Sequence, residues 1–341
     1  MSAPAELLSV RDLSVSFVTE GGVARVLDAV SLSLASGEIM GLVGESGCGK
    51  TTLSRTILGA LPANATVQGG AMIFDGQDLL TFGPAALVDH VRGRAITFVP
   101  QDPYSSFSPL FTIGDQITEL MRWKSPDRRV GERIYARQRR RGDRERALAL
   151  LRSVQLPDPE RLLRKYPHEL SGGQRQRVMI AMALMPEPKL VIADEPTTAL
   201  DVTIQAQILK LLRNLATERG VSVLFATHDL GTAWEICDRV TVMYAGQELE
   251  TAPIDGFFAS PMVPYTRLLL ESLPSSGSAL RGISGDVPNL VSPPPGCRFH
   301  PRCPSATDVC RASHPAAQSP EPGHEVRCHH PHLHMAGIVA A

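Results

Sequence analysis

The sequence predicts an α/β protein, because short apolar runs of strand length alternate with stretches of helical character. Apolar runs at 38–43, 96–99, 190–193 and 221–226 have the length and the flanking residues of buried strands. Stretches of helical character at 50–58 and 175–184 lie between them. The chain has 341 residues, a length that predicts about two domains.

Composition and charge exclude several classes of protein. Apolar residues make up 43% of the chain and charged residues 20%, which argues for a packed core and against disorder. The net charge is −1, so the basic excess of a nucleic-acid-binding protein is missing, and we expect no nucleic acid among the partners. The apolar run at 178–185 is far too short to span a bilayer, and the first ten residues lack the pattern of a signal peptide. We therefore expect a soluble, intracellular chain that reaches a membrane only through a partner.

The C-terminal part of the chain differs in composition from the rest. Four of the six Cys and seven of the ten His lie in the last 45 residues, and 14 of the 27 Pro lie at or after Pro253. This change predicts a domain boundary near Asp255, which divides the chain into 1–255 and 256–341. A separate stretch, Arg122–Arg146, holds ten Arg and one Lys against four acidic residues, and we expect it to form a solvated helical face or loop.

The segment between the first predicted strand and the following helix has the pattern G-x-x-x-x-G-K-T. In such a loop the glycines let consecutive backbone N–H groups point at a phosphate, and the helix N-terminus adds a partial positive charge. The lysine reaches the β- and γ-phosphates, and the threonine hydroxyl ligates Mg²⁺. A Gly-rich turn with a chance Lys-Thr is the alternative, but the setting between strand and helix favours the phosphate site. The residues are Gly44, Glu45, Ser46, Gly47, Cys48, Gly49, Lys50 and Thr51, followed by Thr52.

Two carboxylates follow the apolar run at 190–193. Asp194 comes at the end of this predicted strand, where a carboxylate can hold Mg²⁺ through water. Glu195 comes next and can orient an attacking water or take its proton. Alone these two acids are weak evidence, but beside the phosphate loop they indicate a site that hydrolyses a nucleotide.

A short segment with the sequence LSGGQ precedes the helical stretch at 175–184. Its serine and glutamine form a capping-box pattern, so a well-capped helix is the simpler interpretation. Its two glycines at a helix start also suit a phosphate that comes from outside the chain. The residues are Leu170, Ser171, Gly172, Gly173 and Gln174.

Two further polar residues follow predicted strands. His228 comes after the run at 221–226, at the strand end where ligands of α/β proteins bind. Gln101 comes after the run at 96–99 and Pro100. Both positions favour contact with a ligand rather than a place in the core.

With these five motifs in this order, residues 7 to about 255 resemble the ATP-binding subunits of ABC transporters. The motifs are the phosphate loop, the Q-loop at Gln101, the LSGGQ signature, the Walker B strand with its glutamate, and the His switch at His228. The resemblance implies an α/β P-loop NTPase fold, the ABC-type nucleotide-binding domain. This fold has an antiparallel β subdomain and an α-helical subdomain at about 102–180, here followed by a small Cys-rich C-terminal extension. The resemblance also places a D-loop at Ala199–Asp201 and an adenine-stacking aromatic at Phe17, although a lone Phe in a strand is as often a core residue.

A narrower resemblance is to the oligopeptide/dipeptide importer subgroup, which also includes importers of nickel and glutathione. The segments Gln101–Pro109, Asp194–Gln207 and Pro264–Leu269 are similar to those of the subgroup, except that Ser108 stands where Asn is common. The resemblance implies a peptide cargo, with nickel or glutathione as alternatives. A soluble ABC ATPase that acts on DNA or ribosomes is a competing class; the single phosphate loop, the lack of sustained heptads and the neutral charge argue against it.

The resemblance also implies a mechanism and a set of partners. ATP–Mg²⁺ on the phosphate loop is enclosed by Ser171 and Gly173 of a second ATPase subunit, which is usually a different chain in this subgroup. Glu195 positions water and His228 contacts the γ-phosphate. Two transmembrane permease subunits, and through them an extracytoplasmic substrate-binding protein, complete an importer at the inner membrane of a bacterium, with this chain peripheral on the cytoplasmic face. Magnesium contacts are implied for Thr51, Gln101 and Asp194, and nucleotide contacts extend to Asp201.

The four C-terminal cysteines have a spacing that leaves their chemistry open. Cys297, Cys303, Cys310 and Cys328 are separated by five, six and seventeen residues. A reducing cytoplasm disfavours disulfides, and a Pro-rich segment with little apolar material needs some staple to stay ordered. No C-x₂₋₄-C pair occurs, so the pattern leaves zinc and an iron–sulfur cluster about even. The resemblance implies a [4Fe–4S] cluster, because subgroup members with a similar arrangement hold one. The rival ligands, which we expect to form a solvated terminal run, are His329, His330, His332 and His334.

Overall fold

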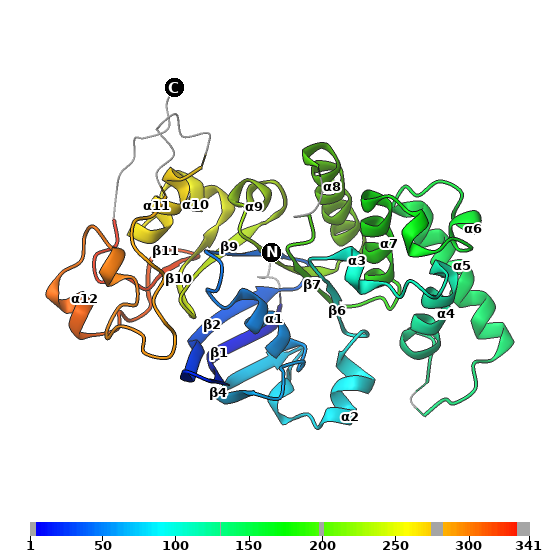
Figure 1. Cartoon of the computed structure of the whole chain (residues 1–341), viewed down its shortest axis with the longest axis horizontal. Helices are drawn as coiled ribbons and strands as arrows, with labels where there is room; N and C mark the ends of the chain where they lie inside the picture. The colour runs from blue at the N-terminus through cyan, green and yellow to red at the C-terminus, as the bar shows by residue number, and fades with distance from the viewer. Residues whose placement is uncertain (1–4, 130, 198–200, 274–281, 333–341) are drawn as a thin grey trace. The chain divides into compact units, whose positions relative to one another are not determined.

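The structure of the protein is a computed structural model that describes residues 5–129, 131–197, 201–273 and 282–332 (Figure 1). The chain divides into two compact units: unit 1 comprises residues 1–80 and 226–341, and unit 2 comprises residues 81–225. The division falls inside strand β8 (Ser222–Thr227). Unit 1 is therefore built from two separate parts of the sequence.

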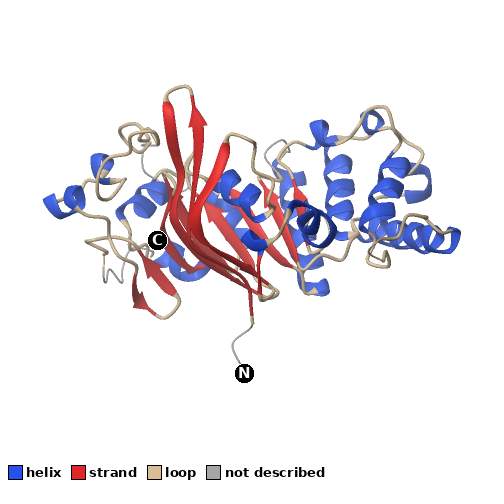
Figure 2. Cartoon of the chain, turned by 90° about the horizontal axis from the view of Figure 1, so that it is seen from below, coloured by secondary structure: helices blue, strands red, loops and turns tan. Residues whose placement is uncertain are grey.

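The N-terminal part of unit 1 is an antiparallel sheet with the strand order β2-β1-β4-β5, whose long strands are seen in Figure 2. Apolar residues alternate with polar ones over most of the two longest strands, so mainly one face of β2 is buried, whereas residues 7–10 of β1 are buried on both faces. Phe17 lies on this sheet, half-buried, opposite Ala24 and Ala65 of the neighbouring strands. The strands are β1 (Glu6–Thr19), β2 (Gly22–Ala35), β4 (Ala65–Phe74) and β5 (Gln77–Asp78).

A second sheet in unit 1 has the strand order β11-β12-β10-β9-β3. Its first strand in the chain, β3, is parallel to β9, and the remaining pairs are antiparallel. Every residue of β3 is buried, as expected for a strand covered on both faces. The strands are β3 (Ile39–Val43), β9 (Arg239–Tyr244), β10 (Gln247–Pro253), β11 (Gln318–Glu321) and β12 (His324–Val326), with helices α1 (Lys50–Ile57) and α9 (Leu230–Ile236) beside them.

Residues beyond Pro253 form a C-terminal extension that is anchored on β10. The buried carboxylate of Glu250 accepts hydrogen bonds from the backbone N–H groups of Met262 (2.7 Å) and Val263 (3.1 Å) and from Nε2 of His324 (2.7 Å). Because β12 pairs with β10, the extension completes a sheet that begins before the predicted boundary at Asp255. Its other elements are α10 (Ile254–Ala259), α11 (Pro264–Glu271), the 3₁₀ turn η5 (His300–Arg302) and α12 (Asp308–Ala312).

Unit 2 is mainly helical and contains the parallel strands β6 (Ile96–Val99) and β7 (Leu190–Asp194). Side chains cap two of its longer helices: Thr112 and Asp115 form a capping box at the start of α4, and Asp201 accepts the N–H of Ile204 (2.9 Å) at the start of α8. The helices are α2 (Pro84–Ala86), α3 (Pro103–Ser106), α4 (Ile113–Lys124), α5 (Arg137–Ser153), α6 (Pro159–Leu162), α7 (Gly172–Leu184) and α8 (Val202–Arg219), with the π-helix η2 (Leu87–Val91) and the 3₁₀ turn η3 (Pro167–Glu169). The 3₁₀ turn η1 (Leu79–Thr81) lies where the chain passes from unit 1 to unit 2. Within the described ranges, no helix is both long enough and apolar enough to cross a membrane.

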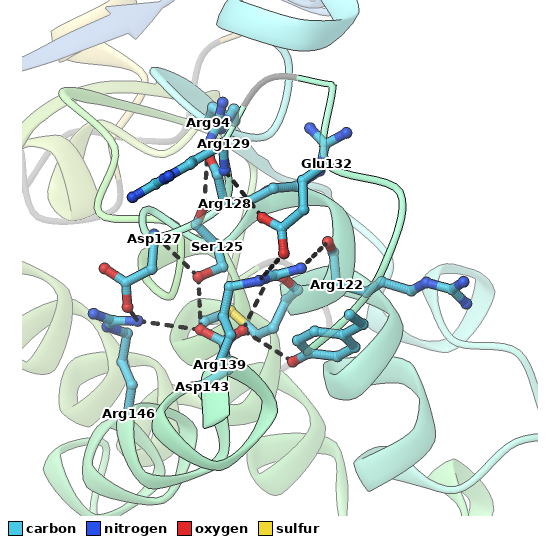
Figure 3. A network of polar contacts seen from close by, with 12 residues as sticks. Arg94, Arg122, Ser125, Asp127, Arg128, Arg129, Glu132, Arg139, Asp143 and Arg146 are labelled. Atoms are coloured by element: carbon cyan, nitrogen blue, oxygen red, sulfur yellow. Dashed lines mark hydrogen bonds and ion pairs between the residues drawn. The ribbon is translucent and has the colours of Figure 1, made fainter. Parts of the chain in front are cut away.

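The polar core of the helical part of unit 2 is organised around the carboxylate of Asp143 on α5, which is buried (Figure 3). One carboxylate oxygen accepts from the hydroxyl of Ser125 (2.6 Å) and from Arg146 (3.3 Å). The other accepts from the hydroxyl of Tyr135 (2.9 Å) and from Arg139 (3.3 Å). Four donors thus compensate the loss of water around this charge.

The prediction of a solvated Arg-rich face is wrong for part of this stretch. The Arg139 side chain is only 10% exposed, whereas that of Arg141, two residues along α5, is 84% exposed. Arg139 also donates to the carbonyl oxygens of Met121 and Arg122, so it binds the C-terminal end of α4. Charge density alone did not reveal this role, because the partner carboxylate becomes buried only when α4 and α5 pack.

We expect Asp143→Ala to lower the local stability of α4 and α5 by about 3 kcal/mol, because it leaves two guanidinium groups and two hydroxyls without their buried acceptor. Hydrogen exchange of the α5 amides measures this change. Glu145→Ala is the matched control: its pair with Arg141 is exposed, so its effect should stay within about 0.5 kcal/mol. Equal protection of α5 in the two variants would contradict the interpretation.

Candidate functional site

Residues Gly44–Thr51 form a tight loop between the end of β3 and the start of α1 in unit 1. A Cβ atom on Gly44, whose φ is +147°, would lie 2.1 Å from the carbonyl oxygen of Met243 on β9. The loop therefore packs too closely on β9 for a side chain at this position. Its backbone is tied to the β9–β10 turn as well, since the N–H of Gly246 donates to the carbonyl oxygen of Cys48 (2.9 Å).

The ammonium group of Lys50 points into this loop. Its Nζ atom donates to the carbonyl oxygens of Gly44 (2.7 Å) and Glu45 (3.3 Å), and the residue is 6% exposed. Neutral carbonyls are weaker partners for a buried cation than an anion would be. Together with the N-terminus of α1, the arrangement therefore suits a phosphate group. Thr51 is exposed at the first turn of α1, so its hydroxyl is accessible to a ligand of the loop.

Two of the predicted site residues meet in unit 2. Gln101 follows β6, and its Nε2 donates to Oε2 of Glu195, which follows β7, at 2.9 Å. The register of the two parallel strands places Val99 opposite Ala193, which brings these strand ends together. Glu195 has a φ of +48°, a conformation that costs of order 1 kcal/mol in a non-glycine residue and re-aims its side chain. Asp194 lies at the buried end of β7.

The segment after Gln101 is attached to the helix that carries the LSGGQ sequence, also within unit 2. The guanidinium carbon of Arg175 lies 3.6 Å from the ring centroid of Tyr104, a cation–π contact. Two nitrogens of Arg175 also donate to the carbonyl oxygen of Leu170 (3.1 and 2.6 Å). Asp102 caps the short helix α3, and the N–H of Tyr104 that it accepts lowers the pKa of its carboxyl. The side chain of Arg175 therefore contacts both segments.

The predicted capping box of the LSGGQ segment is confirmed. The N–H of Gln174 donates to the hydroxyl of Ser171 (3.3 Å), and Oε1 of Gln174 accepts the N–H of Ser171 (3.1 Å). Ser171 is exposed, and Gly172 and Gly173 form the first turn of α7 and are half-buried. The start of this helix is thus open to a ligand.

Three further predicted residues fall within the described ranges. His228 is exposed in unit 1 between β8 and α9, whose first turn is capped by Asp229. Asp201 caps α8 in unit 2, but Ala199 and Leu200 of the predicted D-loop lie outside the described residues. Phe17 occupies the antiparallel sheet of unit 1, half-buried.

The four C-terminal cysteines line one small cavity in unit 1, of about 20 Å³, together with apolar side chains that include Leu249 and Phe299. Burial raises the pKa of the Cys297, Cys303 and Cys328 thiols, that of Cys328 to about 12. Thiols at such sites stay protonated unless a cation binds, and a metal ligand must be a thiolate. In the described part of the chain no group of three or more His, Cys, Asp and Glu residues could hold a metal ion, so the predicted metal centre is not supported as an assembled site.

The predicted solvated histidine run is confirmed only in part: His330 is exposed, His329 and His332 are half-buried, and all three make hydrogen-bond contacts within the extension. Nε2 of His329 contacts the carbonyl oxygen of Ser313 (2.9 Å), and Nε2 of His330 contacts the hydroxyl of Thr307 (2.7 Å). The N–H of His332 donates to the carbonyl oxygen of Met262 (2.8 Å). These residues pack the end of the extension onto itself, and His334 lies outside the described residues.

Sequence patterns missed two arginines that join the extension to the rest of unit 1. Arg298 is 2% exposed; it donates to Asp28 on β2 (2.7 Å) and to the carbonyl oxygen of Ala245 in the β9–β10 turn. Arg302 donates to Glu45 of the phosphate loop. Nothing in the sequence indicated these contacts, because Arg302 and Glu45 are 257 residues apart.

Comparison with known proteins identifies matches along most of the chain. The family model described as ABC transporter matches residues 27–198, and the model described as oligopeptide/dipeptide transporter, C-terminal region, matches residues 249–310. A probable peptide ABC transporter ATP-binding protein of Sinorhizobium fredii is 47% identical over 94% of this chain and 94% of its own length. Dipeptide transport ATP-binding proteins of Bacillus subtilis and Escherichia coli are 43% and 42% identical over 95% of this chain and 94% and 97% of their own lengths.

Solved structures show the same fold. An ATP-binding cassette, solved as a dimer in a post-hydrolysis state bound to ADP and phosphate, matches 73% of this chain and 99% of its own with a TM-score of 0.61 and 27% identity. A component of an ABC transporter complex from Clostridium perfringens matches 74% of this chain and 91% of its own, also with a TM-score of 0.61 and 27% identity.

Proposed function

Because the chain belongs to the ABC transporter family, we propose that it is the ATP-binding and ATP-hydrolysing subunit of an importer of dipeptides or oligopeptides. The ATPase part of this proposal is carried by the buried Lys50 ammonium, which points into a loop that ends at a helix N-terminus. The peptide part is supported by the match of the C-terminal region and by relatives of 41–47% identity that are named for peptide transport.

The family resemblance assigns roles to residues of the phosphate loop in unit 1 and to residues that follow β6 and β7 in unit 2. Lys50 and the loop N–H groups bind the phosphates. Thr51, Asp194 and Gln101 would hold Mg²⁺, which supplies positive charge to the phosphates, and hydroxyl, carboxylate and amide oxygens are the donors this ion prefers. Glu195 positions the attacking water, and its bond from Gln101 holds the carboxylate in place.

A second ATPase subunit, different from this chain, completes the proposed site. The LSGGQ segment and Asp201 serve the ATP of that subunit, a role supported by the exposure of Ser171 and by the dimer of the similar cassette. His228 contacts the γ-phosphate. The contact of Tyr104 with Arg175 links the Q-loop to the LSGGQ helix and would carry closure of the dimer to the permease.

The proposed assembly contains two transmembrane permease subunits and an extracytoplasmic substrate-binding protein. This chain is peripheral on the cytoplasmic face of a bacterial inner membrane. We divide it into a nucleotide-binding domain at 1–255, with a helical subdomain at about 102–180, and an importer-specific domain at 256–341. The packing of β12 on β10 supports a firm attachment of the second domain to the first.

Membrane association tests the importer assignment. We expect the chain to sediment with membranes only when the permease encoded with it is co-expressed, because the chain itself offers no spanning helix in its described part. Purification of the whole complex from the native host should recover a binding protein that retains peptides. Sedimentation that is indifferent to the permease would contradict the assignment, and a binding protein loaded with nickel or glutathione would replace the peptide cargo.

Two substitutions distinguish ATP binding from ATP hydrolysis. We expect Glu195→Gln to keep ATP binding and to lower turnover roughly 100-fold or more, because an amide cannot accept a proton from water. Lys50→Ala should instead lose ATP binding, since the phosphates lose their cationic partner. Phosphate release and ATP binding are measured for each variant in the assembled complex. Full turnover by Glu195→Gln would remove Glu195 from the proposed role.

We also propose, on the family resemblance, that the four C-terminal cysteines hold a [4Fe–4S] cluster, with zinc as the alternative. The proposal is supported by the position of all four thiols around one cavity, since soft thiolate donors suit iron–sulfur clusters and zinc alike. The cluster would be structural or regulatory. Loading would require the thiols to lose their protons, which their raised pKa values oppose until iron is bound.

Metal content decides between these alternatives. Protein purified without oxygen should be brown and contain iron and acid-labile sulfide in equal amounts, and Cys303→Ser with Cys310→Ser should be colourless. Colourless wild-type protein with one zinc per chain would establish the alternative, and colour that survives in the double variant would overturn the assignment of the ligands.

A further inference from the structure

The extension contacts the phosphate loop through the buried side chains of Arg302 and Tyr265, and Arg302 supplies the charge. The Arg302 side chain is 4% exposed, and all five of its N–H groups have an acceptor. Two nitrogens bind the Glu45 carboxylate, at 2.7 Å to Oε2 and 3.1 Å to Oε1. The remaining N–H groups donate to the carbonyl oxygens of Ser284 (3.1 Å) and Ile283 (3.1 Å) and to the hydroxyl of Tyr244 (3.3 Å).

The loop residue that Arg302 binds is held at its other polar groups too. The N–H of Glu45 donates to the hydroxyl of Tyr265 on α11 (3.1 Å), and its carbonyl oxygen accepts from Lys50 (3.3 Å). The rings of Tyr265 and Tyr244 lie 4.7 Å apart and each lies 5.1 Å from the ring of Phe299. The extension therefore holds both the side chain and the backbone of the second residue of the loop.

The ion pair between Arg302 and Glu45 affects the electrostatics of nucleotide binding. Glu45 places a negative charge in the loop that binds the negatively charged phosphates of ATP, and an unpaired carboxylate there would repel them. A bidentate guanidinium pair neutralises the carboxylate and fixes its direction. Lysine cannot replace this arrangement, because an ammonium group binds as a point charge and has three donors.

We infer that Arg302 is a positioning residue for the ATP site: it neutralises Glu45 and holds the phosphate loop in its binding shape, so that the affinity for ATP depends on the folded extension. Arg302 is the last residue of η5, and Cys303, which lines the cysteine cavity, follows it directly. A structural change at this cavity would therefore occur one residue away from the Arg302–Glu45 pair. The inference rests on the proposal that Gly44–Thr51 binds the phosphates of ATP.

The test is a double-variant cycle in the full-length chain, with the dissociation constant for Mg²⁺–ATP as the readout. We expect Arg302→Ala to weaken binding about tenfold and Arg302→Lys to weaken it less. Glu45→Gln removes the charge that needs compensation. In that background Arg302→Ala should change the dissociation constant by less than about twofold. A merely structural role of Arg302 would predict the same loss with either residue at position 45.

Arg311→Ala is the matched control, because Arg311 belongs to the same extension but, among the described residues, forms its ion pair with the exposed Asp308. It should bind ATP as wild type does. If Arg302→Ala does not fold, the cycle of Arg302→Lys with Glu45→Gln gives a smaller coupling of the same sign, because lysine keeps the charge but loses the bidentate pair. Wild-type affinity in folded Arg302→Lys and Arg302→Ala, or equal losses in both backgrounds, would overturn the inference. Absence of ATP binding in the wild type, or its persistence in Lys50→Ala, would instead overturn the proposed site.

Discussion

The close packing of the phosphate loop on the β9–β10 turn is the constraint on which the rest of unit 1 depends. Gly44 leaves no room for a side chain against Met243, and Gly246 of the turn donates to the loop at Cys48. A Cβ atom on Gly246 would in turn lie 2.4 Å from the carbonyl oxygen of Val26 on β2. Strand β2, the loop and the turn therefore meet at backbone distance, and a larger residue at either glycine would separate them.

The C-terminal extension also contacts the β9–β10 turn, β2 and the phosphate loop, and it does so with charged side chains. Arg298 crosses the turn to reach Asp28, and Arg302 reaches the loop itself at Glu45. Both guanidinium groups are almost fully buried, and burial of a charge is tolerated only when it is paired and hydrogen-bonded. Buried polar groups also join β12 of the extension to β10, where His324 contacts Glu250. Buried polar contacts thus attach this segment to the rest of unit 1, together with apolar packing of Tyr265 and Phe299 on Tyr244.

Unit 2 shows how local and tertiary effects combine around a candidate site. Capping boxes set where α4 and α7 begin, and these depend only on neighbours in the sequence. The contacts of Gln101 with Glu195 and of Arg175 with Tyr104 depend instead on the parallel pairing of β6 with β7 and on the packing of α7. Gln101 therefore contacts the end of β7, and Tyr104, three residues further on, contacts the LSGGQ helix α7.

The sequence by itself predicted the strands β3, β6, β7 and β8 to within one residue and the N-cap of α7 at Ser171. These features follow from apolar runs, glycines and capping pairs, which act over a few residues. The burial of Arg139, the histidine contacts of the extension and the bond from Arg302 to Glu45 were decided only by the tertiary structure. An isolated charge in a sequence looks solvated, because its partner is brought to it only when distant segments pack and exclude water.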